Sequence, residues 1–138
     1  MKPWLLVLAA GCSSTPAGPG VFEIGEWTDI TGNPDLGALS SPDQQSVDFG
    51  IWKTKDGSWH IWECIRFTQV GGHTRLFYGW HAATPTGPWT ADGIVMQADP
   101  SVGEAEGGLR APFVLDDGTR YRMFYGTWDN LCEQTSSD

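Results

Sequence analysis

The sequence predicts an all-β fold, and three features of its pattern favour this class. Short apolar runs rich in aromatic and β-branched residues alternate with turns, and no segment shows the periodicity of an amphipathic helix. The 138-residue chain contains 18 Gly and 9 Pro, which interrupt it without a short repeat. A hairpin signal, Asp-Gly followed by a hydroxyl residue, occurs in each of two similar stretches. The length is that of one ordinary domain.

The charge balance limits the partners that the chain can have. Lys and Arg number 8 against 17 Asp and Glu, so the net charge is −9. Such a chain lacks the basic surface that binds nucleic-acid phosphates, and nucleic acid is therefore excluded as a partner. With 8 Trp and a hydrophobic content of 40%, the sequence is also too apolar for a disordered acidic tail.

Residues 1–11 have the pattern of a signal peptide. A positive charge at Lys2 precedes the apolar run 4–10, which is much shorter than the roughly 20 residues that span a bilayer as a helix. The small residues before Cys12 resemble the lipobox of bacterial lipoproteins. This resemblance implies an exported protein, periplasmic or on the cell surface, that is anchored to the membrane by a lipid on Cys12. An ordinary secretion signal with an incidental cysteine is the alternative.

Two further regions precede the expected strands. Residues 12–20 are rich in Ser, Pro and Gly and predict a polar tether, and residues 21–45 predict an irregular lead-in. If Cys12 carries a lipid, Cys64 and Cys132 remain as a pair, and either a disulfide or two free buried thiols would suit their strand-like surroundings. No C-x-x-C motif or His pair accompanies them, so no metal site is predicted.

Residues 46–106 predict a meander of four short strands. Asp56-Gly57 gives the first hairpin turn, and segments rich in Gly and Pro give the others. Residues 107–138 repeat the pattern, with the turn recurring at Asp117-Gly118 and the chain ending before a fourth strand. The expected strands are 48–54, 59–66, 74–81 and 89–96 in the first unit, and 110–116, 120–125 and 131–135 in the second.

Four-stranded units at a regular spacing are typical of β-propeller blades. We therefore expect the first one to two blades of an incomplete propeller, with blade one at 46–106 and an unfinished blade two at 107–138. A propeller closes with about 4–8 blades, so we expect the N-terminal fragment of a longer protein. Phe113, Met123 and Tyr125 would then face water where a third blade is missing, and the fragment alone would aggregate or stay molten.

Three segments of the chain resemble the catalytic propellers of bacterial glycosidases, namely the five-bladed glycoside hydrolases of families 43 and 32. The segments are 47–51, which open blade one, 84–90, which hold a Gly-Pro-Trp turn, and 109–112 followed by 121–126. The resemblance covers about residues 45–138. It implies that the all-β fold is a five-bladed propeller and that the function is glycoside hydrolysis.

The same resemblance implies that Asp48 is the catalytic base or nucleophile. In those families carboxylates from the second and third blades complete the site. At the second-blade position this chain has Phe113 where family 43 is acidic and Ala111 where family 32 is acidic, and the third-blade Glu lies beyond Asp138. One carboxylate of three is matched, so we expect this fragment to be inactive.

Strand directions place the candidate residues at one end of the sheets. If Asp48 begins the first strand, the second strand returns Arg66 beside it, and the second unit begins at the same end. The group expected there is Asp48, Arg66, His73, Glu104, Glu106, Arg110, Trp128 and Asp129. The predicted substrate-binding residues are Arg66, Arg110, Trp52, Trp128, Asp129, Glu106 and His73. Arg can bind sugar hydroxyls, and Trp offers a flat apolar face to a sugar ring.

Structural alternatives exist for these residues. Asp48 could bond backbone amides at a strand start, and Arg66 and Arg110 could form ion pairs between blades. Glu104 and Glu106 could replace the missing second-blade acid or belong to a solvated loop. The aromatic residues that alternate along strands predict inter-sheet packing; they are Trp59, Trp62, Phe77, Trp80 and Tyr125.

The favoured interpretation is an exported, carbohydrate-active propeller that hydrolyses poly- or oligosaccharides in its full-length form. A carboxylic acid and a carboxylate suffice for that reaction. No cofactor is therefore expected, although a propeller channel can hold a structural cation. The alternatives are a non-catalytic carbohydrate-binding propeller and a surface scaffold that binds protein partners.

Overall fold

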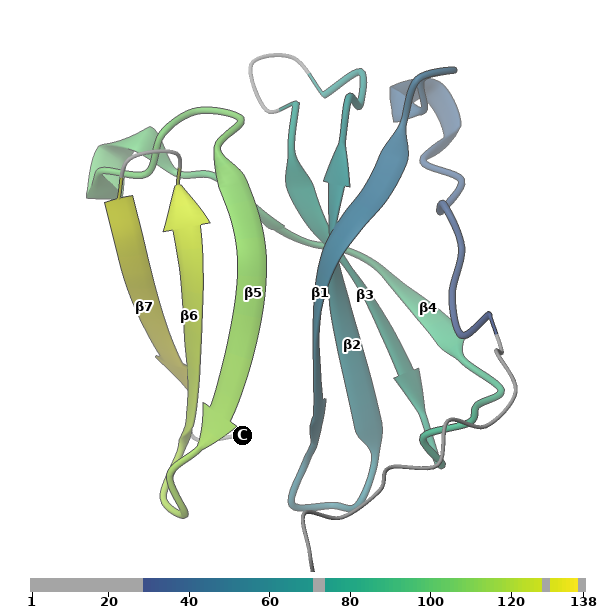
Figure 1. Cartoon of the computed structure of the whole chain (residues 1–138), viewed down its shortest axis with the longest axis vertical. Coiled ribbons are helices and arrows are strands. Elements are labelled where there is room, and N and C mark those ends of the chain that lie inside the picture. The colour runs from purple at the N-terminus through teal and green to yellow at the C-terminus, as the bar shows by residue number, and fades with distance from the viewer. Residues whose placement is uncertain (1–28, 71–73, 128–129, 137–138) are drawn as a thin grey trace, which may run out of the picture.

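The computed structural model describes residues 29–70, 74–127 and 130–136, and within these ranges the fold is all-β (Figure 1). The first sheet contains β1 (Gln45–Lys53), β2 (Trp59–Arg66), β3 (Leu76–Ala82) and β4 (Thr90–Gln97). The second contains β5 (Leu109–Asp116), β6 (Tyr121–Thr127) and β7 (Asn130–Ser136). Two short 3-10 helices, η1 (Gly37–Leu39) and η2 (Pro100–Val102), lie outside the sheets. The predicted all-β class and the positions of the expected strands are confirmed.

Both sheets are antiparallel meanders in which each strand pairs with the next one in the sequence. The strand orders are β1-β2-β3-β4 and β5-β6-β7. The two Asp-Gly turns connect β1 to β2 and β5 to β6, with φ of +92° at Gly57 and +86° at Gly118. Glycine adopts these angles at little cost because it has no Cβ. The predicted hairpins are thus confirmed, together with the strand order of both units.

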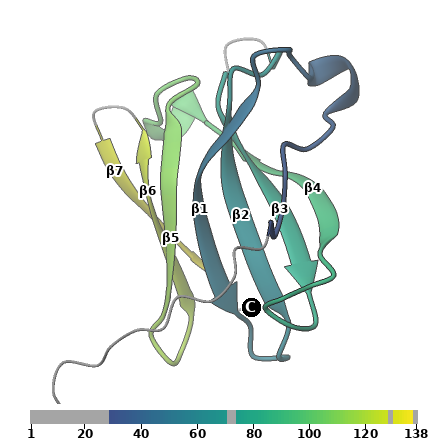
Figure 2. The same ribbon diagram turned by 45° about the vertical axis from the view of Figure 1, so that its right-hand side comes forward.

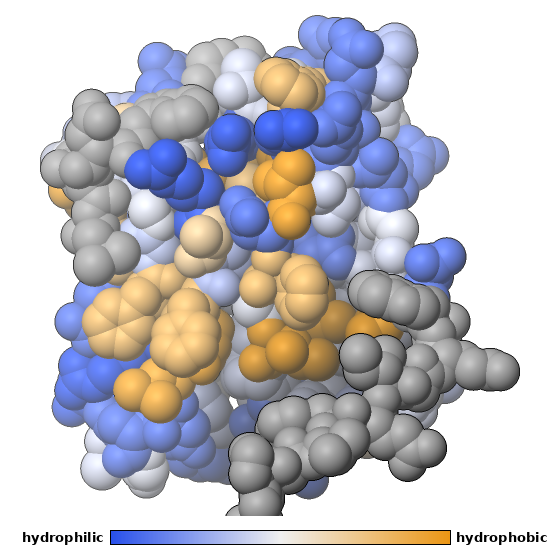
Figure 3. Space-filling view, in the orientation of Figure 1, coloured by the Kyte–Doolittle hydropathy of each residue, from blue (hydrophilic) through white to orange (hydrophobic). Residues whose placement is uncertain are grey.

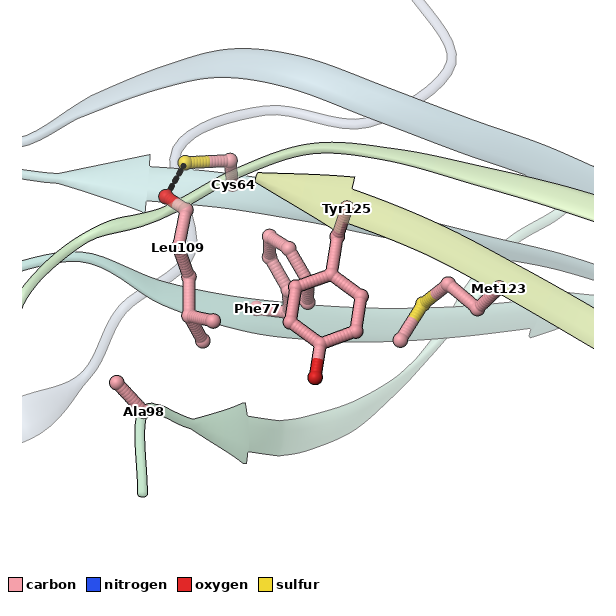
Figure 4. Close-up of a cluster of buried hydrophobic side chains, with 6 residues drawn as sticks. All are labelled: Cys64, Phe77, Ala98, Leu109, Met123 and Tyr125. Carbon is pink, nitrogen blue, oxygen red and sulfur yellow. Dashed lines mark hydrogen bonds between the residues drawn. The ribbon is translucent and has the colours of Figure 1, made fainter. Parts of the chain in front are cut away.

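The two sheets pack together, and β1 and β5 lie side by side and run in the same direction (Figures 1 and 2). The rings of Phe77 and Tyr125 meet edge to face between the sheets, with centroids 6.1 Å apart (Figure 4). The Cys64 thiol donates a hydrogen bond of 3.1 Å to the carbonyl oxygen of Leu109, which joins the first sheet to the start of β5. The buried cluster between the sheets consists of Cys64, Phe77, Ala98, Leu109, Met123 and Tyr125.

This cluster corrects the expectation that Met123 and Tyr125 face water. They are 7% and 3% exposed, because the alternation of side chains along β6 turns both toward the first sheet. Phe113 is 61% exposed, as expected, since it lies opposite Phe124 on the other face of the second sheet. The second sheet therefore already has a partner for one of its faces.

The expected inter-sheet packing of the aromatic residues holds for part of the set. Besides Phe77 and Tyr125, Trp62 packs against the cluster between the sheets. Trp80 is also buried, but it belongs to a cluster on the other face of the first sheet. Trp59 is half-buried, and the ammonium of Lys53 lies 6.0 Å from its ring centroid.

Residues 29–44 partly cover the outer face of the first sheet. Leu36 packs there against an apolar cluster that includes Ile61 and Trp80. The carboxylate of Glu63 is buried on β2 and accepts hydrogen bonds from the hydroxyls of Thr31 and Ser46. Because a buried carboxylate needs such donors, these bonds hold the lead-in segment against the sheet.

Apolar side chains nevertheless remain exposed on both outer faces. Phe49 on β1 and Phe113 on β5 are each 61% exposed. Figure 3 shows apolar residues gathered on the side of the molecule that carries β1 and β5. The exposed large apolar residues of these two strands are Val47, Phe49, Ile51, Phe113 and Leu115. Surface of this kind is usually covered by further protein.

The close contact of β1 with β5 depends on Gly50. A Cβ atom at this position would lie 2.7 Å from the carbonyl oxygen of Pro112 and 3.7 Å from Cα of Phe113. Both atoms belong to backbone, which cannot move aside as a flexible side chain can. Any larger residue at position 50 would therefore push the two strands apart.

We expect Gly50→Ala to lower the free energy of unfolding by about 1–3 kcal/mol, because overpacking a tight contact strains the backbone. Urea unfolding followed by tryptophan fluorescence would measure the change. Gly32→Ala is the matched control, since a Cβ at Gly32 would meet no atom within 4 Å. Equal unfolding midpoints for the two variants would contradict the importance of this contact.

Candidate functional site

The structure places Asp48, Arg66 and Arg110 at the same end of the two sheets. Near the start of β1, Gln45 pairs with Arg66, the last residue of β2, and Asp48 lies three residues further on. Arg110 is the second residue of β5, which starts at this same end (Figure 1). This convergence was expected from the strand directions. Three other expected members, His73, Trp128 and Asp129, lie outside the described residues.

Asp48 is half-buried on β1 and lies opposite Cys64, next to a register shift between Ser46 and Asp48. Along β1 its side chain is on the same face as Gly50, which is the face turned toward β5. Burial, together with the negative charge of Asp48, raises the pKa of the Cys64 thiol to about 11 against the opposing effects of Arg75 and Arg66. Asp48 thus lies in a region of interacting charges where the sheets meet.

Arg66, the last residue of β2, is held in place by contacts with neighbouring side chains. Its guanidinium group donates two hydrogen bonds to the side-chain oxygen of Gln45 and lies 4.9 Å from the ring centroid of Phe67. Arg110 lies across Gly126 on β6, where a Cβ would come within 2.8 Å of the arginine Nε. Both cations therefore have contacts with neighbours on their own side of the molecule, on separate strands and at the same end of the sheets as Asp48.

Glu104 and Glu106 differ sharply in their surroundings. Glu104 is 5% exposed, and its carboxylate accepts a hydrogen bond of 2.6 Å from the backbone N–H of Asp99 and another from the hydroxyl of Tyr125. Burial and this carboxylate raise the pKa of Tyr125 well above its ordinary value. The expectation of a solvated loop is thus wrong for Glu104, while Glu106 is exposed. Glu104 ties the segment between the two sheets to β6, and both of its oxygens are engaged.

Trp52 lies at the other end of the sheets, close to the β1–β2 hairpin, and pairs with His60. It lines a pocket of about 480 Å³ between the two sheets. The structure therefore does not bring Trp52, predicted to bind substrate, together with Asp48, predicted to be catalytic. The pocket is lined by Trp52, Thr54, Lys55, Asp56, His60, Trp62 and Tyr121.

Apart from Trp52, the residues that line this pocket were not predicted from the sequence. Part of the pocket could have been found from the alternation of side chains on β2, which places His60 and Trp62 on the same face of the strand. On β1 these two residues pair with Trp52 and Gly50. The contribution of Tyr121 could not be found in that way, because this residue comes from β6 in the other sheet. His81, to which no role was assigned, is hydrogen-bonded through Nδ1 to the carboxylate of Asp92.

The cysteines and acidic residues show no further chemistry within the described ranges. The sequence left open whether Cys64 and Cys132 form a disulfide or remain free. In the structure both are free thiols. Cys64 is buried and Cys132 is half-buried against the cluster between the sheets. In this part of the chain, no three His, Cys, Asp or Glu side chains gather so that they could hold a metal ion.

Comparisons with known proteins did not identify a relative: no protein-family profile matches the chain, and no curated protein matches it. Among the described residues, no helix is long and apolar enough to cross a membrane.

We expect Glu104→Ala to lower the free energy of unfolding by about 2–4 kcal/mol, because it leaves the Asp99 N–H and the Tyr125 hydroxyl without their acceptor.

Because the pKa of Tyr125 is raised in the folded chain, the stability linked to its proton is complete below about pH 10 and is lost as the pH rises further. Glu104→Ala should weaken this loss, which urea unfolding at about pH 8 and about pH 11 would measure. Glu106→Ala is the control, because Glu106 is exposed. An equal decrease in the free energy of unfolding in both variants would show that Glu104 does not anchor the segment.

Proposed function

We propose that the chain forms part of a carbohydrate-active β-propeller resembling glycoside hydrolases of families 43 and 32, with Asp48 as the catalytic base or nucleophile. In its full-length form the protein would hydrolyse glycosidic bonds of poly- or oligosaccharides. The observation that carries the proposal is the position of Asp48, half-buried near the start of the first strand, at the end where both sheets begin.

The arrangement of the sheets supports the propeller. Successive blades of a propeller are meanders that pack together around a central channel, with their first strands innermost. Here β1 and β5, the first strands of two successive meanders, lie side by side and run in the same direction. The exposed Phe49 and Phe113, on the two outer faces, lie where neighbouring blades would pack.

The chemistry requires a second carboxyl group beside Asp48. One group protonates the leaving oxygen, and the other attacks the anomeric carbon or activates water. Arg66 and Arg110 would bind sugar hydroxyls. Of the two glutamates predicted at this end, Glu104 is not available as the acid because both of its oxygens are engaged, whereas Glu106 is exposed.

A non-catalytic carbohydrate-binding propeller is the second candidate. It is favoured by Ala111 and Phe113, which occupy the positions where the resemblance expects an acid. In that case Asp48 would accept hydrogen bonds from sugar hydroxyls and would not take part in bond cleavage. A scaffold that binds protein partners would show neither saccharide hydrolysis nor saccharide binding.

We expect Asp48→Asn to reduce hydrolysis of a panel of oligosaccharides by the full-length protein at least about a thousandfold, since the amide can neither attack nor accept a proton. Released reducing ends would be quantified for both proteins. Asp29→Asn changes an exposed aspartate of the lead-in and should leave the rate unchanged. Saccharide binding without any turnover by the unsubstituted protein would support the second candidate.

We further propose that the protein is exported and anchored to a membrane by a lipid on Cys12, which lies outside the described residues. The proposal is supported by the apolar run, the small residues before Cys12 and the polar tether that follows. Mass spectrometry of the mature N-terminus is expected to give a diacylglyceryl-modified Cys12, and Cys12→Ser should abolish the modification. A mature chain that begins at any other residue would disprove lipid anchoring while leaving export intact.

A further inference from the structure

The pocket at the hairpin end of the sheets has the composition of a ligand site. Its volume of about 480 Å³ is within the range of small-molecule pockets. It lies between the β1–β2 hairpin of the first sheet and Tyr121 of the second, at the opposite end from Asp48. We propose that this pocket binds a neutral sugar ring of an oligosaccharide, as a second carbohydrate site separate from the Asp48 end.

Aromatic side chains form two walls of the pocket. The ring of Trp62 is inclined at 79° to that of Trp52, with centroids 5.6 Å apart, so the two indoles meet as a corner. His60 stacks on Trp52 at a centroid distance of 5.5 Å and an angle of 20°, and its Nε2 lies 3.1 Å from the hydroxyl of Ser58. These contacts fix the indole of Trp52 before any ligand arrives, and a fixed flat surface suits the apolar face of a pyranose ring.

Tyr121 provides the observation that points to a missing ligand. This residue is 6% exposed, and its buried hydroxyl has no hydrogen-bond partner among the described residues. An unpaired buried hydroxyl is costly, and when the side chain turns toward the pocket a ligand hydroxyl could both donate to it and accept from it. The ring of Tyr121 is held by Lys55, whose ammonium lies 5.7 Å from the ring centroid and donates to the carbonyl oxygen of Thr119 at 3.2 Å.

The remaining polar groups favour a neutral, hydroxyl-rich ligand. Asp56 accepts hydrogen bonds from Thr54 and Ser58, which hold the pKa of its carboxyl well below the usual range and keep it an acceptor. One carboxylate and one ammonium, Asp56 and Lys55, line the same pocket, so their charges balance. An anionic ligand would meet the carboxylate, and a lipid chain would leave the polar groups unpaired. The choice of a sugar among neutral polar ligands rests on the proposed function.

The test is a titration of the full chain with three neutral trisaccharides, xylotriose, cellotriose and arabinotriose, followed by the NMR signals of the indole N–H groups. We expect at least one of them to shift the signals of Trp52 and Trp62. Trp52→Ala should weaken its binding at least about tenfold, and Tyr121→Phe about three- to tenfold, because it removes one hydrogen bond without changing the packing. Inorganic phosphate and decanoate test the anionic and the lipid-like ligand, and neither should shift these signals.

Two controls separate this inference from the proposed function. Trp59→Phe changes the neighbouring aromatic residue, which does not line the pocket, and Asp48→Asn changes the other end; neither should alter the affinity. Tyr121→Phe should keep the wild-type circular dichroism spectrum, so that its weaker binding cannot come from unfolding. Binding that is unchanged in both Trp52→Ala and Tyr121→Phe, or stronger binding of phosphate or decanoate than of any trisaccharide, would overturn the pocket proposal. Loss of hydrolysis in Asp48→Asn would be unaffected by that outcome.

Discussion

The contact between β1 and β5 at Gly50 and Pro112 is the constraint on which the rest of the structure depends. Two meander sheets can approach this closely only where one strand has no side chain, and Gly50 supplies that position. Since both strands run in the same direction, the starts of the two sheets meet at one end and their hairpins meet at the other. Along the inner face of β1, Asp48 precedes this contact by two residues and Trp52 follows it by two. One strand therefore presents a carboxylate to one end of the molecule and an indole to the other.

Two buried glutamates fix the irregular segments around the sheets. Glu63 binds Thr31 of the lead-in, and Glu104 binds Tyr125 of β6 and the backbone at Asp99. A carboxylate removed from water is tolerated only when donors replace the lost hydration, and both residues have two such donors. Their oxygens are thus committed to structure. By contrast, Asp48 is half-buried and Glu106 is exposed.

The sequence was sufficient for the local features and for the direction of each strand. Apolar alternation located the strands, Asp-Gly fixed the hairpins, and antiparallel order brought Asp48, Arg66 and Arg110 to one end. Properties that depend on packing between the sheets were not accessible. Alternation shows that Met123 and Tyr125 share a face of β6, but it cannot say that this face is the one covered by the first sheet.

The burial of Glu104 and the hairpin-end pocket were missed for the same reason. Glu104 lies between glycine-rich segments, which is the local pattern of a solvated loop. It becomes a buried acceptor only because Tyr125 of the second sheet lies beside it. The pocket likewise combines Trp52 and Trp62 of the first sheet with Tyr121 of the second. To predict such sites, one must know which faces of the two sheets pack together. The spacing of residues within one strand does not give this information.

The separation of the two ends determines how two carbohydrate sites on this chain would act together. Asp48 and Trp52 are four residues apart on one strand, which corresponds to about 13 Å along β1. The contact at Gly50 closes the direct path between them, so a sugar of one or two rings would occupy either site alone. A longer polysaccharide passing around the edge of the sheets could reach both, and its binding at the pocket would raise the local concentration of glycosidic bonds near Asp48. The pocket would thus favour polymeric over short substrates without any change in the chemistry at Asp48.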